Sequence, residues 1–239
     1  MRKLIKKSRF ILLIFGAFVA SLLVIGQANA ATTVFEYEVS FGAIDPAGPT
    51  PYLTATFDDA DFGTGFDVRL TIFGANLNPT IESATELYFN LNPLLDSSYL
   101  TFSAVNTTDI DSNWTVANII TGNDSQPADG DGLYDILFDL PPPRGQFANR
   151  FTAGETLVFD ISYSGVETLD ASSFSFFSTP QGGQGTFMAA AHIQNIDGNG
   201  DGATGSGFVG VVPEPVSSTL FLVGAATLGF RRLRRNRKG

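Results

Sequence analysis

Short apolar runs with a period of two dominate the sequence between Thr32 and Val212, and Gly, Pro, Asn and Asp interrupt them every few residues. Successive side chains of a β-strand point to opposite faces of a sheet, so this alternation is typical of half-buried strands. No segment shows the period of an amphipathic helix of any length. The expected strands are 34–41, 66–73, 85–91, 99–105, 114–121, 133–140, 156–163, 173–177, 185–196 and 207–212.

Short strands with fairly regular turn signals predict an all-β domain: two antiparallel sheets packed face to face as a jelly-roll-like β-sandwich. The chain has 22 phenylalanines, which are expected to fill the space between the sheets. The proline run at 141–143 cannot donate ladder hydrogen bonds and should end the strand before it. The chain has no cysteine, which excludes disulfides, thiolate nucleophiles and thiolate metal ligands.

The first 30 residues have the three parts of a secretory signal peptide. Five basic residues lie among the first nine positions, an apolar run follows at 10–25, and Ala28-Asn29-Ala30 supplies a small-x-small site. Signal peptidase is therefore expected to cut after Ala30, so that the mature chain starts at Ala31. An uncleaved N-terminal anchor is the alternative, because the apolar run could nearly span a bilayer.

Charge is segregated along the chain, whose formal net charge is −10. Of the 24 acidic residues, 23 lie between Glu36 and Asp201, whereas only Arg69, Arg144 and Arg150 are basic between the terminal basic clusters. Such an acidic field repels nucleic acid and anionic lipid and favours cation binding. A nucleic-acid partner is therefore not expected for the domain at 31–211.

The composition changes abruptly at 212–239. Pro213-Glu214-Pro215 is followed by an apolar segment at 216–230 and a basic tail at 231–238. As a helix the apolar segment would be about 22 Å long, which makes a short transmembrane helix against about 30 Å of hydrocarbon. The basic cluster should hold the C-terminus in the cytoplasm, so the precursor would be anchored in the inner membrane with its β domain outside.

The order of Pro213-Glu214-Pro215, short apolar helix and terminal arginine cluster, together with an N-terminal signal peptide, resembles the PEP-CTERM sorting signal of Gram-negative bacteria that make extracellular polysaccharide. The resemblance covers about the last 28 residues. It implies that the transpeptidase exosortase cuts near the Pro-Glu-Pro motif and passes the domain to the cell surface or the extracellular space. A tail anchor that is never processed is the alternative.

The segments at 57–61, 87–93 and 190–194 also resemble secreted domains that precede such tails. Those domains have no established enzymatic role, so the resemblance implies a location rather than a chemistry.

Two acidic loops are candidate calcium sites. Asp197, Asn199 and Asp201 alternate before Gly202, as in the first half of a calcium-binding loop, but Phe208 stands where the bidentate glutamate would be. The second loop is also dense in carboxylates and contains Asp129, Asp131 and Asp135. The alternative for both loops is an ordinary turn, since Asp, Asn and Gly favour turns.

The sequence contains no catalytic residue that stands out. His192 is the only histidine, and within a strand it is expected to be a structural hydrogen-bonding residue. The leading hypothesis is a non-enzymatic surface or matrix protein, structural or associated with extracellular polysaccharide. The alternative is a secreted enzyme acting on polysaccharide through two carboxylates about 5 to 9.5 Å apart.

Overall fold

The computed structural model describes residues 30–42, 44–60, 65–110, 114–129, 131–140, 150–183, 185–196 and 205–212. Its strands are β1 (Thr32–Tyr37), β2 (Val39–Phe41), β3 (Leu53–Asp58), β4 (Val68–Gly74), β5 (Ser83–Phe89), β6 (Leu100–Asn106), β7 (Ile119–Ala128), β8 (Gly132–Asp139), β9 (Thr156–Tyr163), β10 (Thr179–Pro180), β11 (Ala189–Ile196) and β12 (Gly205–Val211). Its short 3-10 helices are η1 (Ser97–Tyr99), η2 (Val116–Asn118) and η4 (Ala171–Phe174).

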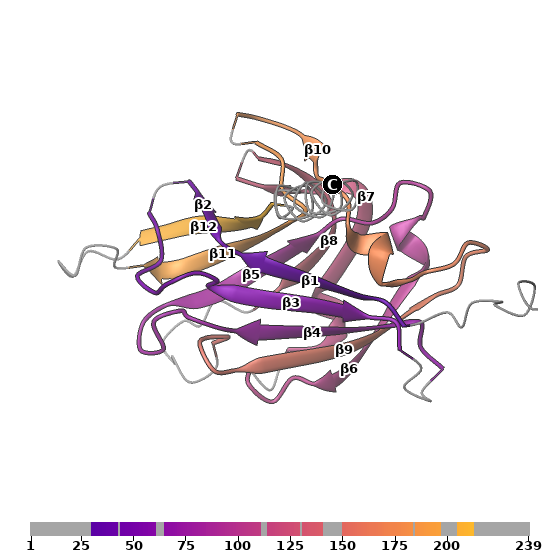
Figure 1. Ribbon diagram of the computed structural model, residues 1–239, viewed down its shortest axis with the longest axis horizontal. Coiled ribbons are helices and arrows are strands. Elements are labelled where there is room, and N and C mark those ends of the chain that lie inside the picture. Colours follow the sequence, from indigo (N-terminus) through magenta and orange to yellow (C-terminus); the bar gives the residue numbers. More distant parts are fainter. Residues whose placement is uncertain are drawn as a thin grey trace, which may run out of the picture.

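The strands form two antiparallel sheets, which confirms the predicted all-β sandwich. Sheet A has the order β1-β3-β4-β9-β6, and sheet B has the order β10-β8-β5-β11-β12-β2, with β7 also paired to β8. Figure 1 shows the strands of sheet A lying across those of sheet B. The chain passes repeatedly from one sheet to the other, so neighbours in a sheet are often distant in sequence.

The core between the sheets is rich in phenylalanine, as predicted. Phe57 of β3 lies edge-on to Phe89 of β5 at 5.3 Å between ring centroids, and Phe89 lies edge-on to Phe138 of β8 at 5.7 Å. Phe138 in turn contacts Phe159 of β9 at 5.1 Å. Edge-to-face aromatic contacts add to the energy of burial. This chain of rings therefore links the two sheets through the centre of the sandwich.

A second aromatic cluster lies on the other face of sheet B. Phe41, Phe187 and Phe208 pack with Tyr88 and Tyr134, and the rings of Phe41 and Phe187 stack at 4.4 Å. Along β5, Tyr88 alternates with core residues and so points to the opposite face. The expectation that the phenylalanines fill the space between the sheets therefore holds for only part of them.

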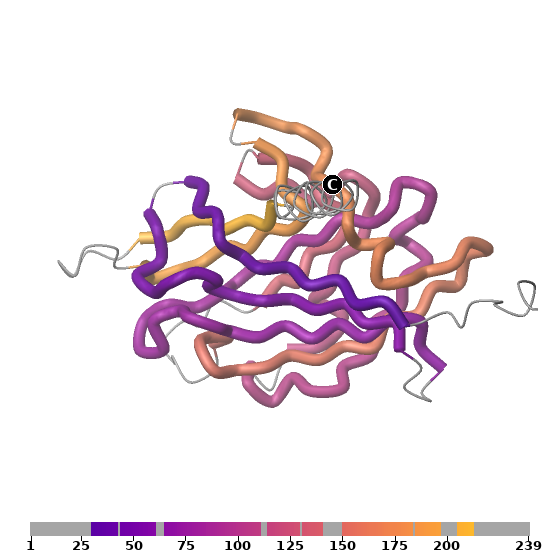
Figure 2. The backbone as a smooth tube through the Cα atoms, in the orientation of Figure 1, coloured from indigo at the N-terminus to yellow at the C-terminus, as the bar shows by residue number. Residues whose placement is uncertain are grey.

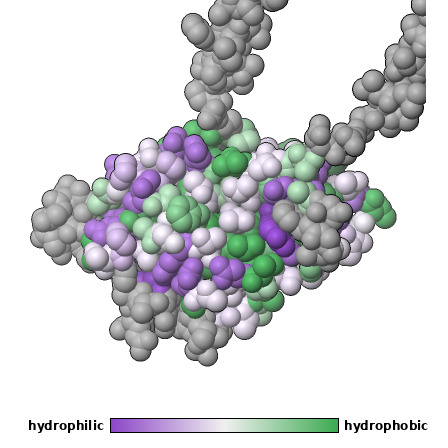
Figure 3. Space-filling view, turned by 60° about the horizontal axis from the view of Figure 1, so that its bottom comes forward, coloured by the Kyte–Doolittle hydropathy of each residue, from purple (hydrophilic) through white to green (hydrophobic). Residues whose placement is uncertain are grey.

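Figure 3 shows another view of the surface, on which hydrophilic and hydrophobic residues are interspersed.

Three predicted strands differ most from the structure. Of the segment 114–121 only 119–121 belong to a strand, β7, because 116–118 form η2. The segment 34–41 is divided at Glu38 into β1 of sheet A and β2 of sheet B. The segment 173–177 is no strand: residues 171–174 form η4, because the Asp170 side chain caps this helix by accepting a hydrogen bond from the Ser173 amide at 2.9 Å. The local capping signal overrides the apolar alternation there.

The strand β3 was missed by the sequence pattern, although Leu53, Ala55 and Phe57 alternate inward along it. The strand β8 ends at Asp139, before the proline run, as predicted. The predicted signal helix and the predicted transmembrane helix lie outside the described residues.

The first and last strands of the domain meet. Phe41 and Val39 of β2 pair with Phe208 and Gly210 of β12 in sheet B, and β1 of sheet A also contacts β12. Figure 2 shows the indigo stretch of β2 beside the yellow stretch of β12. The sandwich is thus closed by contacts between its two ends.

Candidate functional site

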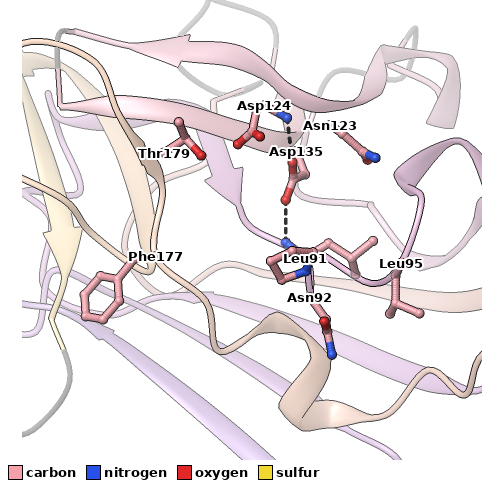
Figure 4. Close-up of a pocket in the computed structure, with 9 residues that line it drawn as sticks. Leu91, Asn92, Leu95, Asn123, Asp124, Asp135, Phe177 and Thr179 are labelled. Atoms are coloured by element: carbon pink, nitrogen blue, oxygen red, sulfur yellow. Dashed lines mark hydrogen bonds between the residues drawn. The ribbon is translucent and has the colours of Figure 1, made fainter.

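A pocket lies where the edge of β8 changes partner. Along one edge β8 pairs with β7, whereas along the other it pairs first with β10, at Gly132 and Leu133, and then with β5, from Ile136 to Asp139. Asp135 stands at the gap between these two partners. The segment that follows β5 and the segment that precedes β10 diverge around this gap and form the walls of the pocket (Figure 4).

The pocket has a volume of about 220 Å³ and mixes apolar with polar side chains. It is small compared with pockets for drug-sized ligands, which are about 300 to 1,000 Å³. Its lining residues are Leu91, Asn92, Pro93, Leu95, Asn123, Asp124, Asp135, Phe177 and Thr179.

The Asp135 carboxylate holds the floor of the pocket together. Its Oδ2 accepts the backbone N–H of Leu91 at 2.7 Å, and its Oδ1 accepts the backbone N–H of Asp124 at 2.7 Å (Figure 4). Leu91 follows β5, while Asp124 lies in a bulge of β7, so one side chain joins the strands on both sides of β8. Burial raises the pKa of Asp135, and the two amide hydrogen bonds partly oppose this effect.

The exposed groups of the pocket are an aromatic ring and polar side chains. Phe177 is 50% exposed and lies at the left of Figure 4, on the other side from Asn123. Asn123, Asp124 and Thr179 are also exposed. An open aromatic ring beside amide, carboxylate and hydroxyl groups can contact both the C–H face and the hydroxyl groups of a ligand.

The carboxylates of Asp129, Asp131 and Asp135, in the second predicted calcium loop, have separate surroundings. Asp131 is buried and accepts a hydrogen bond from the Tyr134 hydroxyl group, whereas Asp135 faces the pocket as described. Asp129 is exposed and has a left-handed backbone, with φ of 30°. Within the part of the chain that the structure describes, no three His, Asp or Glu side chains are placed to hold a metal ion. Asp197, Asn199 and Asp201 lie outside that part.

Burial raises the pKa of the Asp131 carboxyl to about 6, although the hydrogen bond from Tyr134 acts in the opposite direction. Asp131 is only 1% exposed. The group is therefore protonated at mildly acidic pH, unlike an ordinary surface aspartate.

His192 of β11 lies within reach of polar and aromatic neighbours, as expected of a hydrogen-bonding residue in a strand. Its Nδ1 lies 3.2 Å from Thr85 Oγ1 and 3.5 Å from Glu86 Oε2, and its ring stacks on Phe208 at 4.6 Å. Burial lowers the pKa of His192, while the negative charges of Glu86 and Asp129 partly oppose this shift. The Tyr88 hydroxyl group donates to the same Glu86 oxygen at 2.7 Å.

Comparison of the chain with protein family models, curated proteins and solved structures finds no match. Among the described residues, no helix has the length and apolar character to cross a membrane. The predicted sorting residues Pro213, Glu214 and Pro215 and the predicted cleavage-site residue Ala28 lie outside the described residues, whereas Ala30 and Ala31 lie just before β1.

Most of the pocket could not be predicted from the sequence. Asn92, Asn123 and Phe177 come from three separate segments, and each belongs to a stretch that reads as an ordinary turn or a strand end. Among the lining residues, only the carboxylates could be singled out from the sequence, because acidic residues lie close together in that part of the chain. The pocket depends on where β5 and β10 separate along β8, and that separation is a property of the fold.

Proposed function

We propose that this protein is exported and displayed on the cell surface or in the extracellular matrix, where its β-sandwich acts as a non-enzymatic module associated with polysaccharide. Signal peptidase and exosortase would process its two ends. In support, β1 begins at Thr32, directly after the predicted signal cleavage site, and β12 ends at Val211, directly before the Pro-Glu-Pro motif. The sandwich is jelly-roll-like in this proposal, because the chain alternates between the two sheets along its length.

The pocket, which the exposed ring of Phe177 helps to line, supports association with a glycan. Sugar rings offer an apolar C–H face to an aromatic ring and hydroxyl groups to amides and carboxylates. The domain holds 23 acidic residues, and their field opposes the approach of anionic chains. A neutral polysaccharide is therefore the proposed ligand class.

The observation that favours binding over catalysis is the occupation of the Asp135 carboxylate. Both of its oxygens accept backbone N–H groups at 2.7 Å. A general acid or base needs an oxygen within reach of the substrate. Both oxygens of Asp135 thus bind backbone groups of the fold. Asp124 is left as the exposed carboxylate of the pocket.

The alternative, a polysaccharide-acting enzyme, rests on a specific feature of the same pocket. Asp124 and Asp135 lie next to each other in a pocket that an exposed aromatic ring also lines, and glycosidases use two carboxylates. A substrate that displaced the Asp124 amide from Asp135 would free one oxygen.

The test uses protein expressed from the full-length gene with export and purified in detergent. It is applied to an array of neutral and anionic glycans, and release of reducing ends is measured in parallel. We expect binding to neutral glycans without hydrolysis. The change Phe177→Ala should weaken binding about tenfold, which corresponds to about 1.4 kcal/mol.

The matched control is Phe73→Ala, which removes a ring that is 40% exposed on β4, outside the pocket. It should leave binding unchanged. Equal losses for Phe177→Ala and Phe73→Ala would contradict the proposed site. Hydrolysis that disappears in Asp124→Asn would establish the enzyme instead.

A further inference from the structure

Asp59 fixes the start of the first strand. The backbone N–H of Ala31 donates to Asp59 Oδ1 at 2.5 Å, and the backbone N–H of Asp59 donates to the Ala31 carbonyl oxygen at 3.1 Å. The other carboxylate oxygen, Oδ2, accepts the N–H of Ala171 at the start of η4, at 3.2 Å. These bonds extend the ladder between β1 and β3 beyond its last pair, Thr32 with Asp58.

We propose that Asp59 is the binding site for the α-ammonium group that signal removal creates on Ala31. The inference rests on the proposed export, which places the cleavage after Ala30. Its own evidence is different: a carboxylate oxygen already lies at hydrogen-bond distance from the nitrogen that cleavage would free.

Cleavage changes the chemistry of this nitrogen. Signal peptidase hydrolyses the Ala30–Ala31 peptide bond with one water molecule, which leaves a carboxylate on Ala30 and a free amine on Ala31. In the precursor the nitrogen is a neutral amide with a single N–H. In the mature chain the amine takes up a proton at neutral pH, because its ordinary pKa is about 7.7 to 8.0, and it then has three donors. The bond to Asp59 becomes charge-assisted and therefore stronger.

The surroundings favour this ion pair. Between Glu36 and Asp201 the chain has 23 acidic and three basic residues, so a new positive charge meets a strongly negative field. The strand that it fixes, β1, is an edge strand of sheet A. Signal removal would thus anchor the free end of an edge strand, and the mature domain would be more stable than the precursor.

The test is a double-mutant cycle between the amine and the carboxylate. Lys238 is the only lysine after Ala30, so acetylation of the purified protein at its amines modifies only the Ala31 amine and, where the tail is retained, Lys238. The second change is Asp59→Asn, which keeps an oxygen that can accept a hydrogen bond but removes the charge. Melting temperatures of the four proteins are compared at pH 7, after the N-terminal residue has been identified by mass spectrometry.

We expect acetylation to lower the melting temperature of the unchanged protein by a few degrees and to have little effect on Asp59→Asn. The nearby carboxylate should raise the pKa of the Ala31 amine. The extra stability is therefore present below about pH 8 and is lost as the pH rises through the raised pKa. Asp45→Asn, which removes one exposed charge from the loop after β2, is the control and should leave the effect of acetylation intact.

Equal effects of acetylation with and without the Asp59 charge would overturn the inference and leave the proposed export standing. A mature chain that starts at a residue other than Ala31 would overturn the inference and the predicted cleavage site. A titration of the amine by NMR gives an independent readout, since an unshifted pKa in the mature chain would also contradict the ion pair.

Discussion

Arg69 of β4 and Asp160 of β9 lie opposite each other on neighbouring strands of sheet A and form a bidentate ion pair. The Arg69 Nε donates to Asp160 Oδ1 at 2.7 Å, and the Arg69 Nη2 donates to Asp160 Oδ2 at 3.0 Å. Asp160 is 3% exposed. One of the few basic residues of an acidic domain is thus used to satisfy a buried carboxylate between neighbouring strands.

We expect Arg69→Lys to lower the free energy of unfolding by about 1 to 2 kcal/mol, because a lysine cannot form two parallel hydrogen bonds with one carboxylate. Urea unfolding measures this change. Glu36→Gln, on the exposed part of β1, is the control and should stay within about 0.5 kcal/mol of the unchanged protein. An equal stability of Arg69→Lys and the control would show that the second hydrogen bond contributes nothing.

The raised pKa of Asp131, about 6, predicts a loss of stability with rising pH. The unfolded chain has an ordinary aspartate, which loses its proton near pH 3.9, so the folded state binds more protons between about pH 4 and pH 6. The contribution of Asp131 therefore falls through this window, by about 2 to 3 kcal/mol in total. Asp131→Asn should become relatively more stable as the pH rises. Urea unfolding from pH 4 to pH 7 tests this, and parallel curves would contradict the assignment.

Asp135→Asn should destabilise the fold by about 1 to 3 kcal/mol. An asparagine would turn an N–H group toward either the Leu91 or the Asp124 amide, and one of these donors would lose its acceptor. Asp124→Asn is the matched comparison, because its exposed side chain should change stability little. The comparison separates the structural carboxylate of the pocket from the one that is available to a ligand.

Processing of the tail should be visible in protein from the native host. Because the end of the chain resembles a PEP-CTERM signal, we expect the mature protein to lack the basic residues at 231–238 and to end near Pro215. Intact-mass spectrometry measures this. A chain that still ends in Gly239 would leave the unprocessed tail anchor as the explanation.

Calcium should raise the melting temperature by several degrees more than sodium chloride at matched ionic strength. A ligand that binds only the folded state adds about 2.7 kcal/mol at a hundred times its Kd, whereas screening alone needs no site. The structure engages Asp131 and Asp135 with protein groups. The calcium effect is therefore expected to depend on Asp201, and Asp201→Ala should remove it. Equal shifts with both salts would show that the loops are ordinary turns.

The sequence predicted the fold class well because strand alternation is a local signal. The segment 156–163 matches β9 at both ends, and the proline run marks the end of β8. The division at Glu38 could not be foreseen, since the alternation continues unbroken from Phe35 to Phe41 while the chain changes sheets. That change is caused by pairing with β12, far along the chain.

The candidate site was harder to predict for the same reason. Glu82 illustrates the problem: it is fully buried, and its carboxylate accepts the backbone N–H groups of Ala47 at 2.8 Å and Asn78 at 2.7 Å. Asp135 likewise binds two amides from other segments. A carboxylate that will hold two loops together has the same local sequence as one that will bind a cation or remain in solvent.

The pairing of β2 with β12 has a consequence for the proposed export. Sheet B is complete only when residues near position 40 meet residues near position 209. A chain that leaves the cytoplasm from its N-terminus delivers β12 last, so β2 lacks its neighbour until nearly the whole domain has crossed the membrane. Contacts this distant in sequence form slowly, because a long loop must close first. Under the proposed export, the polypeptide would stay incompletely folded during translocation and would close its second sheet only after the final strand had emerged.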